Sequence, residues 1–305
     1  MKNLNNMMES ENILEDYVVP YKDQEIDSKI EEIQQSQLSD EIDLDTLKTI
    51  FSCIDLTTLK ETDSADSVKA FVEKVNGFKE KFPNIPNVGG VCVYPVFSPV
   101  LKQYLKAEGV KRAVVSGGFP ASQTFLDLKV LETKKAVDFG ANEVDVVISV
   151  GEFLEGNYEF VYEEIRQLKE ASKDAHLKVI LETGSLIEPE LIWNASIIAM
   201  DAGADFIKTS TGKSGKAASL TAAYVMCQAI KAYHEKQKRK VGFKPAGGIA
   251  ETRDALKYYA VVKDILGEEW LNNNLFRIGA SRLANNLLTE ILSLEGDSFD
   301  KVEYY

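Results

Sequence analysis

The stretch ADFIKTSTGK, residues 204–213, opens as a buried strand and ends in a loop that contains glycine. Its apolar start predicts a core strand, yet Lys208 stands where a core residue is expected. Because alternate side chains of a strand share one face, Phe206, Lys208 and Ser210 point the same way. A buried ammonium group is costly unless it is paired or neutral. The pattern therefore favours a neutral lysine amine that acts as a nucleophile.

A second stretch, VGFKPAGG at residues 241–248, repeats the arrangement of a short strand, a lysine and a glycine loop. Two cations that lie close together depress each other's pKa, which is one way to free a lysine for Schiff-base chemistry. Lys208 and Lys244 would then act as a pair. The alternative is that both lysines lie at strand ends and extend their ammonium groups to water.

Strand-like and helix-like segments alternate along residues 46–298. The predicted strands are 54–57, 90–94, 112–116, 143–149, 177–182, 205–209, 240–244 and 276–279. The predicted helices are 64–81, 98–108, 124–139, 158–172, 189–202, 221–235, 252–266 and 281–294. Eight such units in about 250 residues predict an α/β fold of the (β/α)8 TIM-barrel type. A doubly wound open sheet is the alternative, which is disfavoured because no GxGxxG motif follows the first strand.

The net charge of −13 is concentrated in an acidic N-terminal extension, residues 1–45. This extension holds 13 acidic and 3 basic residues, whereas the remainder holds 35 acidic and 32 basic residues. Residues 1–25 show no apolar period and are expected to fray, while residues 26–37 favour a helix with Ile30 and Ile33 on one side. We interpret the extension as a solubilising, partly helical segment that precedes a barrel domain, residues 46–298, and a tail, residues 299–305.

The composition disfavours several classes of protein. No basic face is evident, which argues against nucleic-acid binding. No apolar run approaches the roughly 18 residues of a membrane helix, and the polar N-terminus resembles neither a signal nor a transit peptide. Cys53, Cys92 and Cys227 form no disulfide framework or zinc pattern, which favours a reducing, cytoplasmic compartment.

Carboxylates on other predicted strands offer partners for the two lysines. Glu143 and Asp145 share one face of the strand at 143–149, and Asp55 lies near the end of the first strand. A carboxylate inside a barrel needs a cationic partner, and a lysine–aspartate pair can move protons. The alternative for Asp145 is a structural salt bridge that fills the barrel.

Glycine loops follow the last three predicted strands, in a region where barrel enzymes often hold phosphate. These loops contain Thr211, Gly212 and Lys213, then Gly247 and Gly248, and finally Gly279 and Ser281. Backbone N–H groups exposed by glycines, together with a helix N-terminus, bind anions. The residues alone therefore predict a barrel with an amine nucleophile, a carboxylate that moves protons and a phosphate site.

Six segments of the chain resemble the deoxyribose-phosphate aldolase family. They are DLTTL at 55–59, VCVYP at 91–95, EVDVV at 143–147, LKVILETG at 177–184, FIKTSTGK at 206–213 and VGFKPAGG at 241–248. The resemblance spans roughly residues 50–300. It implies a class I aldolase on a (β/α)8 barrel that needs no metal or other cofactor and is commonly a homodimer. The implied reaction is reversible cleavage of 2-deoxy-D-ribose 5-phosphate to acetaldehyde and D-glyceraldehyde 3-phosphate, in deoxyribonucleotide and carbohydrate degradation.

The resemblance also implies roles for individual residues. Lys208 forms the Schiff base, Lys244 lowers its pKa, and Asp145 moves protons through water. Tyr305 matches a tyrosine on a mobile tail that assists proton transfer in the family, and a disordered tail is the alternative. The residues expected to bind the substrate and its phosphate are Asp55, Thr211, Gly212, Lys213, Gly247, Gly248, Gly279 and Ser281.

The chain departs from the family pattern after Ser281. Some members have a second serine there, whereas this chain has Arg282, which either strengthens the phosphate site or faces solvent. Two other functions stay open. One is a Schiff-base aldolase of the transaldolase or fructose-bisphosphate type, although a bisphosphate needs a second phosphate site and only one is evident. The other is a catalytically silent barrel that binds a sugar phosphate.

Overall fold

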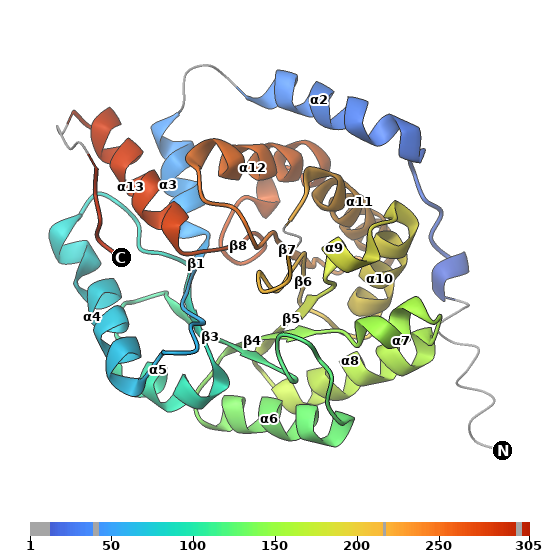
Figure 1. Cartoon of the computed structure of the whole chain (residues 1–305). Coiled ribbons are helices and arrows are strands. Elements are labelled where there is room, and N and C mark those ends of the chain that lie inside the picture. Colours follow the sequence, from blue (N-terminus) through green and yellow to red (C-terminus); the bar gives the residue numbers. More distant parts are fainter. Residues whose placement is uncertain (1–12, 39–42, 216–217, 297–300) are drawn as a thin grey trace.

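The computed structural model describes residues 13–38, 43–215, 218–296 and 301–305, which form a (β/α)8 barrel (Figure 1). The strands are β1 (Ile54–Thr57), β2 (Gly90–Val93), β3 (Lys111–Ser116), β4 (Glu143–Val147), β5 (His176–Ile180), β6 (Phe206–Lys208), β7 (Gly242–Lys244) and β8 (Ile278–Ala280). They pair in parallel in the order β7-β6-β5-β4-β3-β2-β1-β8. Bridges from Phe243 to Phe276 and from Ala246 to Gly279 join the two ends, so the predicted barrel is confirmed.

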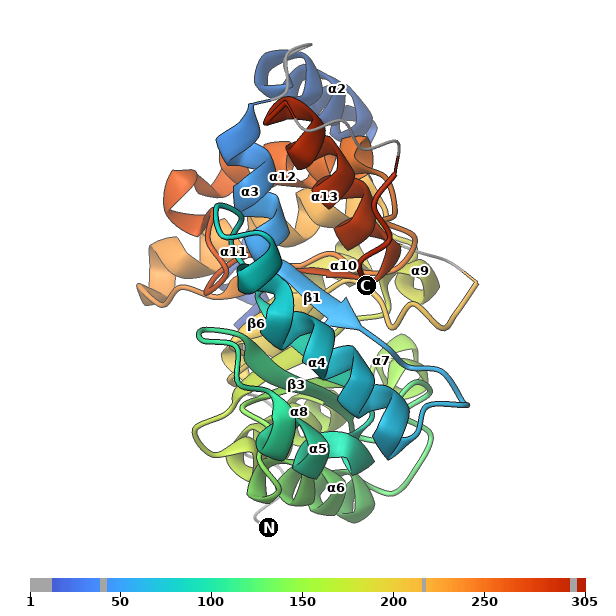
Figure 2. The same ribbon diagram turned by 90° about the vertical axis from the view of Figure 1, so that its left-hand side faces the viewer.

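Helices surround the strands on the outside (Figures 1 and 2). The α-helices are α2 (Ile26–Gln37), α3 (Leu44–Ser52), α4 (Ala65–Lys81), α5 (Ser98–Tyr104), α6 (Leu126–Asp138), α7 (Val150–Leu154), α8 (Tyr158–Ser172), α9 (Thr183–Leu186), α10 (Pro189–Asp201), α11 (Leu220–Gln237), α12 (Thr252–Leu266) and α13 (Arg282–Leu294). Short 3-10 turns are η1 (Asp23–Glu25), η2 (Pro95–Phe97) and η3 (Glu268–Trp270). No described helix is long and apolar enough to cross a membrane.

Local sequence signals fix several helix ends. Ser64 and Ser67 form a reciprocal capping box that begins α4, and Pro189 begins α10 at the position where proline is tolerated. Gly140 and Gly203 follow α6 and α10 with φ of 117° and 109°, a region that favours glycine. These features place the helices within a few residues of their predicted ranges.

Three helices depart from the sequence-based prediction. The helix expected over 98–108 ends at Tyr104, because Leu105 takes an extended backbone conformation. The short helices α7 and α9 were not predicted, since four or five residues are too few to show a helical period. Both lie in loops that follow strands, on the side of the barrel where barrel enzymes place their active sites.

The described part of the N-terminal extension packs on the barrel. Helix α2 contacts α11 and α12 and buries Ile26, Ile30 and Ile33 (Figure 1). Upstream, the ring of Tyr17 stacks on Tyr233, with 6.0 Å between ring centroids. Residues 13–25 were expected to fray because they show no apolar period. In the structure, the aromatic ring of Tyr17 anchors this segment to the barrel. Residues 1–12 of that prediction lie outside the described residues.

We expect Ile30→Ala to lower the free energy of unfolding by about 2–4 kcal/mol, because it leaves a cavity under α2. Ile30 is 5 % exposed and far in sequence from the pocket residues described below. Thermal unfolding should show the loss, while Glu31→Ala, on the exposed side of the same helix, should unfold like the unmutated protein. Equal melting temperatures for the two variants would mean that the extension does not stabilise the barrel.

The last five residues pack against α4 and α13. The side-chain oxygen of Asn285 accepts hydrogen bonds from the backbone N–H groups of Tyr304 and Tyr305, both at 2.9 Å. The ring of Tyr305 stacks on Phe78, with 5.8 Å between centroids. Residues 301–305 therefore do not form a disordered tail in this structure, and Figure 2 shows the C-terminus lying beside α13.

Candidate active site

Seven charged side chains of the described residues meet inside the barrel, and we call them the charged layer. They are Asp55 on β1, Glu143 and Asp145 on β4, Lys178 on β5, Lys208 on β6, Lys244 on β7 and Arg277 next to β8. Each is at most 4 % exposed. Four of these groups are bases and three are acids, so the layer is electrically balanced when one of the four bases is neutral.

Lys208 is the one base of the charged layer whose pKa lies below its ordinary value. Its Nζ lies 2.8 Å from Oδ2 of Asp145. Burial lowers the pKa of Lys208, and the positive charge of Lys244 lowers it further, against the opposing effect of Asp145. Lys208 is also the one member of the charged layer that lines the pocket described below. Its amine is therefore both available to a ligand and easier to deprotonate than that of a free lysine.

Lys244 behaves differently from the sequence-based expectation that the two lysines depress each other's pKa. Its Nζ donates to Oδ2 of Asp145 at 2.7 Å and also to Asp55. Burial opposes the charge, but these two carboxylates together hold the pKa of Lys244 above its ordinary value. The effect within the pair therefore runs in one direction: Lys244 stays charged and lowers the pKa of Lys208.

Sequence reasoning missed the charged-layer roles of Lys178 and Arg277. Lys178 donates to Glu143 and lies 3.4 Å from Oδ1 of Asp145, while Arg277 pairs with Asp55 and, at 2.9 Å, with Glu143. The available signal was a lone charge within each apolar segment. In register, Lys178 stands beside Asp145 on the neighbouring strand, so the strand pairing would have identified it.

Asp145 and Asp55 are both fully buried in the charged layer. Burial alone would raise the pKa of Asp145, yet the charges of Lys208 and Lys244 hold it well below the ordinary value. Asp145 therefore has the cationic partner that a carboxylate inside the barrel needs, because it lies between Lys208 and Lys244, and its role in proton transfer stays a prediction. Asp55 was expected to contact substrate or phosphate, but it does not line the pocket, and its carboxylate is engaged by Lys244 and Arg277. The structure thus favours a supporting role for Asp55.

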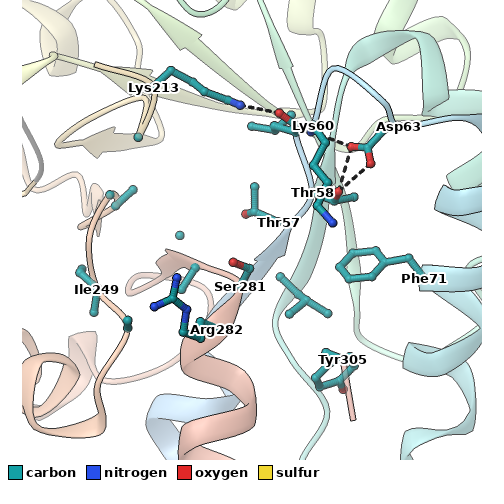
Figure 3. Close-up of a pocket in the computed structure, with 18 of the residues that line it drawn as sticks. Thr57, Thr58, Lys60, Asp63, Phe71, Lys213, Ile249, Ser281, Arg282 and Tyr305 are labelled. Carbon is teal, nitrogen blue, oxygen red and sulfur yellow. Dashed lines mark hydrogen bonds between the residues drawn. The ribbon is translucent and has the colours of Figure 1, made fainter. Parts of the chain in front are cut away.

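A pocket of about 1030 Å³ opens at the carboxyl ends of the strands (Figure 3). Its walls come from the loops after β1, β6 and β7, from the start of α13 and from α4. Seven of the eight predicted substrate or phosphate residues lie in it: Thr211, Gly212, Lys213, Gly247, Gly248, Gly279 and Ser281. The sequence therefore predicted residues that share one wall of the pocket, and their roles in binding stay predictions.

Several backbone N–H groups on this wall of the pocket have no hydrogen-bond acceptor among the described residues. The N–H groups of Gly212, Gly247, Gly248 and Ser281 make no hydrogen bond to any described residue. The three glycines have φ of 73°, 90° and 81°, in the left-handed region that glycine adopts without strain. Neighbouring N–H groups in such turns form a concave anion-binding surface. The wall therefore has the chemistry of a phosphate site.

Two predicted phosphate residues direct their polar groups elsewhere. The hydroxyl of Thr211 donates to Glu182 at 2.6 Å. The ammonium of Lys213 donates to the carbonyl of Leu59 at 2.5 Å, a link across the pocket mouth that Figure 3 shows. Thr211 thus supports the loop, whereas the ammonium group of Lys213 has three N–H donors and uses one of them on Leu59.

Arg282 lies on the pocket wall beside Ser281, with its guanidinium directed toward the cavity (Figure 3). It is exposed, and no described residue forms a hydrogen bond or ion pair with its side chain. Arg282 therefore places an exposed positive charge on the anion-binding wall, and its part in binding phosphate stays a prediction.

Tyr305 also lines the pocket. Its hydroxyl is buried and has no hydrogen-bond partner among the described residues. Burial raises the pKa of this hydroxyl above its ordinary value. A catalytic role for Tyr305 stays a prediction.

If Tyr305 assists proton transfer, Tyr305→Phe lowers kcat by about 10²-fold, a typical loss for a proton-transfer group. Its melting temperature should not fall, because the change removes an unpartnered hydroxyl. Tyr304→Phe is the matched control: its hydroxyl donates to the carbonyl of Lys74 at 2.7 Å, so stability should fall slightly and kcat should stay the same. A Tyr305→Phe protein with kcat within about twofold of the unmutated value would exclude the role.

Among the described residues, no group of three or more His, Cys, Asp or Glu side chains is arranged to hold a metal ion.

The fold and the pocket, with one inner lysine reaching that pocket, define a (β/α)8-barrel enzyme. Residues 49–266 match the DeoC/LacD family aldolase. The chain belongs to this family.

Proteins of known sequence and structure support this assignment. A Caenorhabditis elegans protein provisionally named a deoxyribose-phosphate aldolase is 46% identical over 246 residues, which cover 80% of this chain and 81% of the relative. The Homo sapiens deoxyribose-phosphate aldolase is 43% identical over 253 residues, 78% of each chain. A solved Coccidioides immitis structure, provisionally named for the same activity, has a TM-score of 0.65 and 28% identity, and covers 87% of this chain and 96% of its own.

Proposed function

We propose that this protein reversibly cleaves 2-deoxy-D-ribose 5-phosphate to acetaldehyde and D-glyceraldehyde 3-phosphate through a Schiff base on Lys208. The names of the relatives supply the substrate. One observation carries the mechanism: among the four bases of the charged layer, Lys208 alone has a lowered pKa and alone lines the pocket. A neutral amine that a ligand can reach is what imine formation requires.

The chemistry follows from this amine. The nitrogen of Lys208 attacks the C1 carbonyl of the open-chain sugar, and the resulting carbinolamine loses water to give a protonated imine. The C2–C3 bond then breaks as the C3 hydroxyl loses its proton, and the bonding electrons move into the imine to form an enamine. Protonation of the enamine carbon and hydrolysis release acetaldehyde and restore the amine. The positive imine nitrogen accepts the electrons, so the mechanism calls for no metal.

Asp145 is suited to move protons near this nitrogen. Its Oδ2 lies between the two lysines, at 2.8 Å from Lys208 and 2.7 Å from Lys244. Its Oδ1 is buried and lies 3.4 Å from Nζ of Lys178, but it accepts no hydrogen bond from a described residue. A water molecule held there would connect the carboxylate to the carbinolamine and the enamine. We therefore propose that Asp145 acts through water, with Lys244 keeping the carboxylate ionised.

The wall with unused N–H groups would hold the phosphate. Gly212, Gly247, Gly248 and Ser281 supply neutral donors, and Arg282 supplies a positive charge. Binding the far end of the sugar there orients C1 toward Lys208, so that binding energy supports the reaction at the other end.

Turnover by the unmutated protein tests this function. The release of D-glyceraldehyde 3-phosphate from 2-deoxyribose 5-phosphate can be followed with a coupled reduction that oxidises a nicotinamide cofactor. We expect cleavage of this substrate and none of fructose 1,6-bisphosphate. Preferred cleavage of the bisphosphate, or transfer of a dihydroxyacetone unit, would identify another Schiff-base aldolase. Binding without turnover of any substrate would identify a silent barrel.

We further propose a role in deoxyribonucleotide and carbohydrate degradation, in the cytoplasm, as follows from this reaction and from the three cysteines, which are all free and buried. Association into a homodimer is part of the same proposal. Sedimentation of the purified chain would test it directly, because a dimer has twice the 33.9 kDa mass of the chain.

A further inference from the structure

Glu182, which follows β5, has a left-handed backbone conformation, with φ 54° and ψ 55°. This conformation is unfavourable for residues with a side chain, and such strain is concentrated at functional sites. Hydrogen bonds of 2.9 Å fix the backbone on both sides, because Leu181 donates to the carbonyl of Lys208 and Thr183 donates to that of Thr209. The strained residue is therefore fixed to the strand end that carries the nucleophile.

The side chain of Glu182 reaches the loop that follows Lys208. It is buried and accepts a hydrogen bond from the hydroxyl of Thr211 at 2.6 Å. It also accepts from the backbone N–H of Thr211 at 3.3 Å and from the hydroxyl of Ser214 at 3.2 Å. One carboxylate thus holds both ends of a four-residue turn.

Gly212 lies inside this turn. On its far side, the backbone N–H of Lys213 donates to the hydroxyl of Thr211 at 3.1 Å, which extends the hydrogen-bond chain from Glu182. Gly212 lines the pocket and leaves its own N–H unused, and a Cβ at this position would lie 3.6 Å from Cα of Gly247. The carboxylate therefore holds the loop after β6 against the loop after β7, where the proposed phosphate site lies.

We propose that Glu182 is a positioning residue for the phosphate site, and that it sets the preference for a phosphorylated sugar over a non-phosphorylated one. The proposal rests on the proposed function of the pocket. Glu182 does not line the pocket, and as a carboxylate it would repel an anion, so it acts through Thr211 and Gly212. Without it, the N–H group of Gly212 loses its fixed orientation toward the phosphate.

The test compares 2-deoxyribose 5-phosphate with 2-deoxyribose. In Glu182→Ala, the ratio of kcat/KM for the phosphorylated sugar to kcat/KM for the other should fall at least about tenfold, mainly through a higher KM. Thr211→Val removes the hydroxyl at the other end of the contact and should act in the same direction. Glu182→Gln keeps the shape of the side chain and one acceptor oxygen. Its ratio should therefore lie between the ratios of the unmutated protein and of Glu182→Ala. Glu188→Ala, at an exposed carboxylate six residues further on, should leave the ratio unchanged.

A role limited to stability would lower kcat/KM for both sugars equally and leave the ratio unchanged, and that result would overturn the proposal. The affinity for inorganic phosphate, measured by calorimetry, gives a second readout that does not need turnover. We expect Kd to weaken about tenfold in Glu182→Ala and in Thr211→Val, but not in Glu188→Ala. If the unmutated protein binds phosphate in this way but cleaves neither sugar, the proposed function fails while the role of Glu182 stands. If the Kd for phosphate is unchanged in both Glu182→Ala and Thr211→Val, Glu182 does not position the phosphate site.

Discussion

Lys208→Met should lower kcat/KM for 2-deoxyribose 5-phosphate by on the order of 10⁵-fold or more, because the covalent route is lost and enzymes rarely accelerate reactions by less than about 10⁶-fold. Methionine keeps much of the volume of the side chain. Asp145 retains Lys244 at 2.7 Å and Lys178 at 3.4 Å, so no carboxylate of the charged layer loses all its partners. The coupled assay measures the rate, and thermal unfolding checks that the variant is folded.

Lys134→Met is the matched control, since Lys134 lies on the exposed side of α6. It should keep full activity. A Lys208→Met protein that folds normally and retains more than about one hundredth of the activity would show that the reaction does not need the amine. Similar losses in both variants would point to a general defect of the barrel.

Lys244→Met should lower activity near pH 7 by about 10²- to 10³-fold, and the loss should shrink as the pH rises. Only the neutral amine of Lys208 attacks the sugar, so activity of the unmutated protein rises with pH through the lowered pKa of Lys208, below the 10.5 of a free lysine. Removing the charge of Lys244 removes one cause of that lowering. The remaining three bases then balance three carboxylates only when Lys208 is protonated. The ascending limb of the pH–rate profile therefore moves to higher pH.

Lys244→Arg is the control for this prediction, because it keeps a positive charge beside Lys208. Its ascending limb should stay closer to that of the unmutated protein than the limb of Lys244→Met does. If Lys244→Met loses activity equally at all pH values, Lys244 does not act by lowering the pKa of Lys208. The loss would then reflect the carboxylates of Asp55 and Asp145, which each lose one partner.

The barrel was predictable because its units are regular. Each strand is a short apolar run, and most helices are long enough to show a 3.6-residue period. The pairing of Lys208 with Asp145 was also predictable, since a charge in a buried strand needs an opposite charge nearby. The family resemblance added the substrate, which the residues alone did not supply, and it separated the roles of the two lysines, which the residues alone gave only as a pair.

The rest depended on contacts between distant parts of the chain. Lys178 and Arg277 each look like one charge within an apolar run, and only the closed barrel shows that both pair with Glu143. The conformation of Glu182 has no sequence signature, because glycine is the usual residue where φ is positive. Tyr17 packs as a single aromatic anchor and therefore leaves no period to detect.

Trapping of the imine tests the central claim most directly. The protein is incubated with 2-deoxyribose 5-phosphate and borohydride, and the reduced adduct is located by peptide mass mapping. The proposed mechanism predicts one adduct, on Lys208, that is absent without substrate. An adduct on Lys244 would mean that the two lysines have the opposite roles. Consumption of the substrate with no adduct on either lysine would contradict the Schiff-base mechanism.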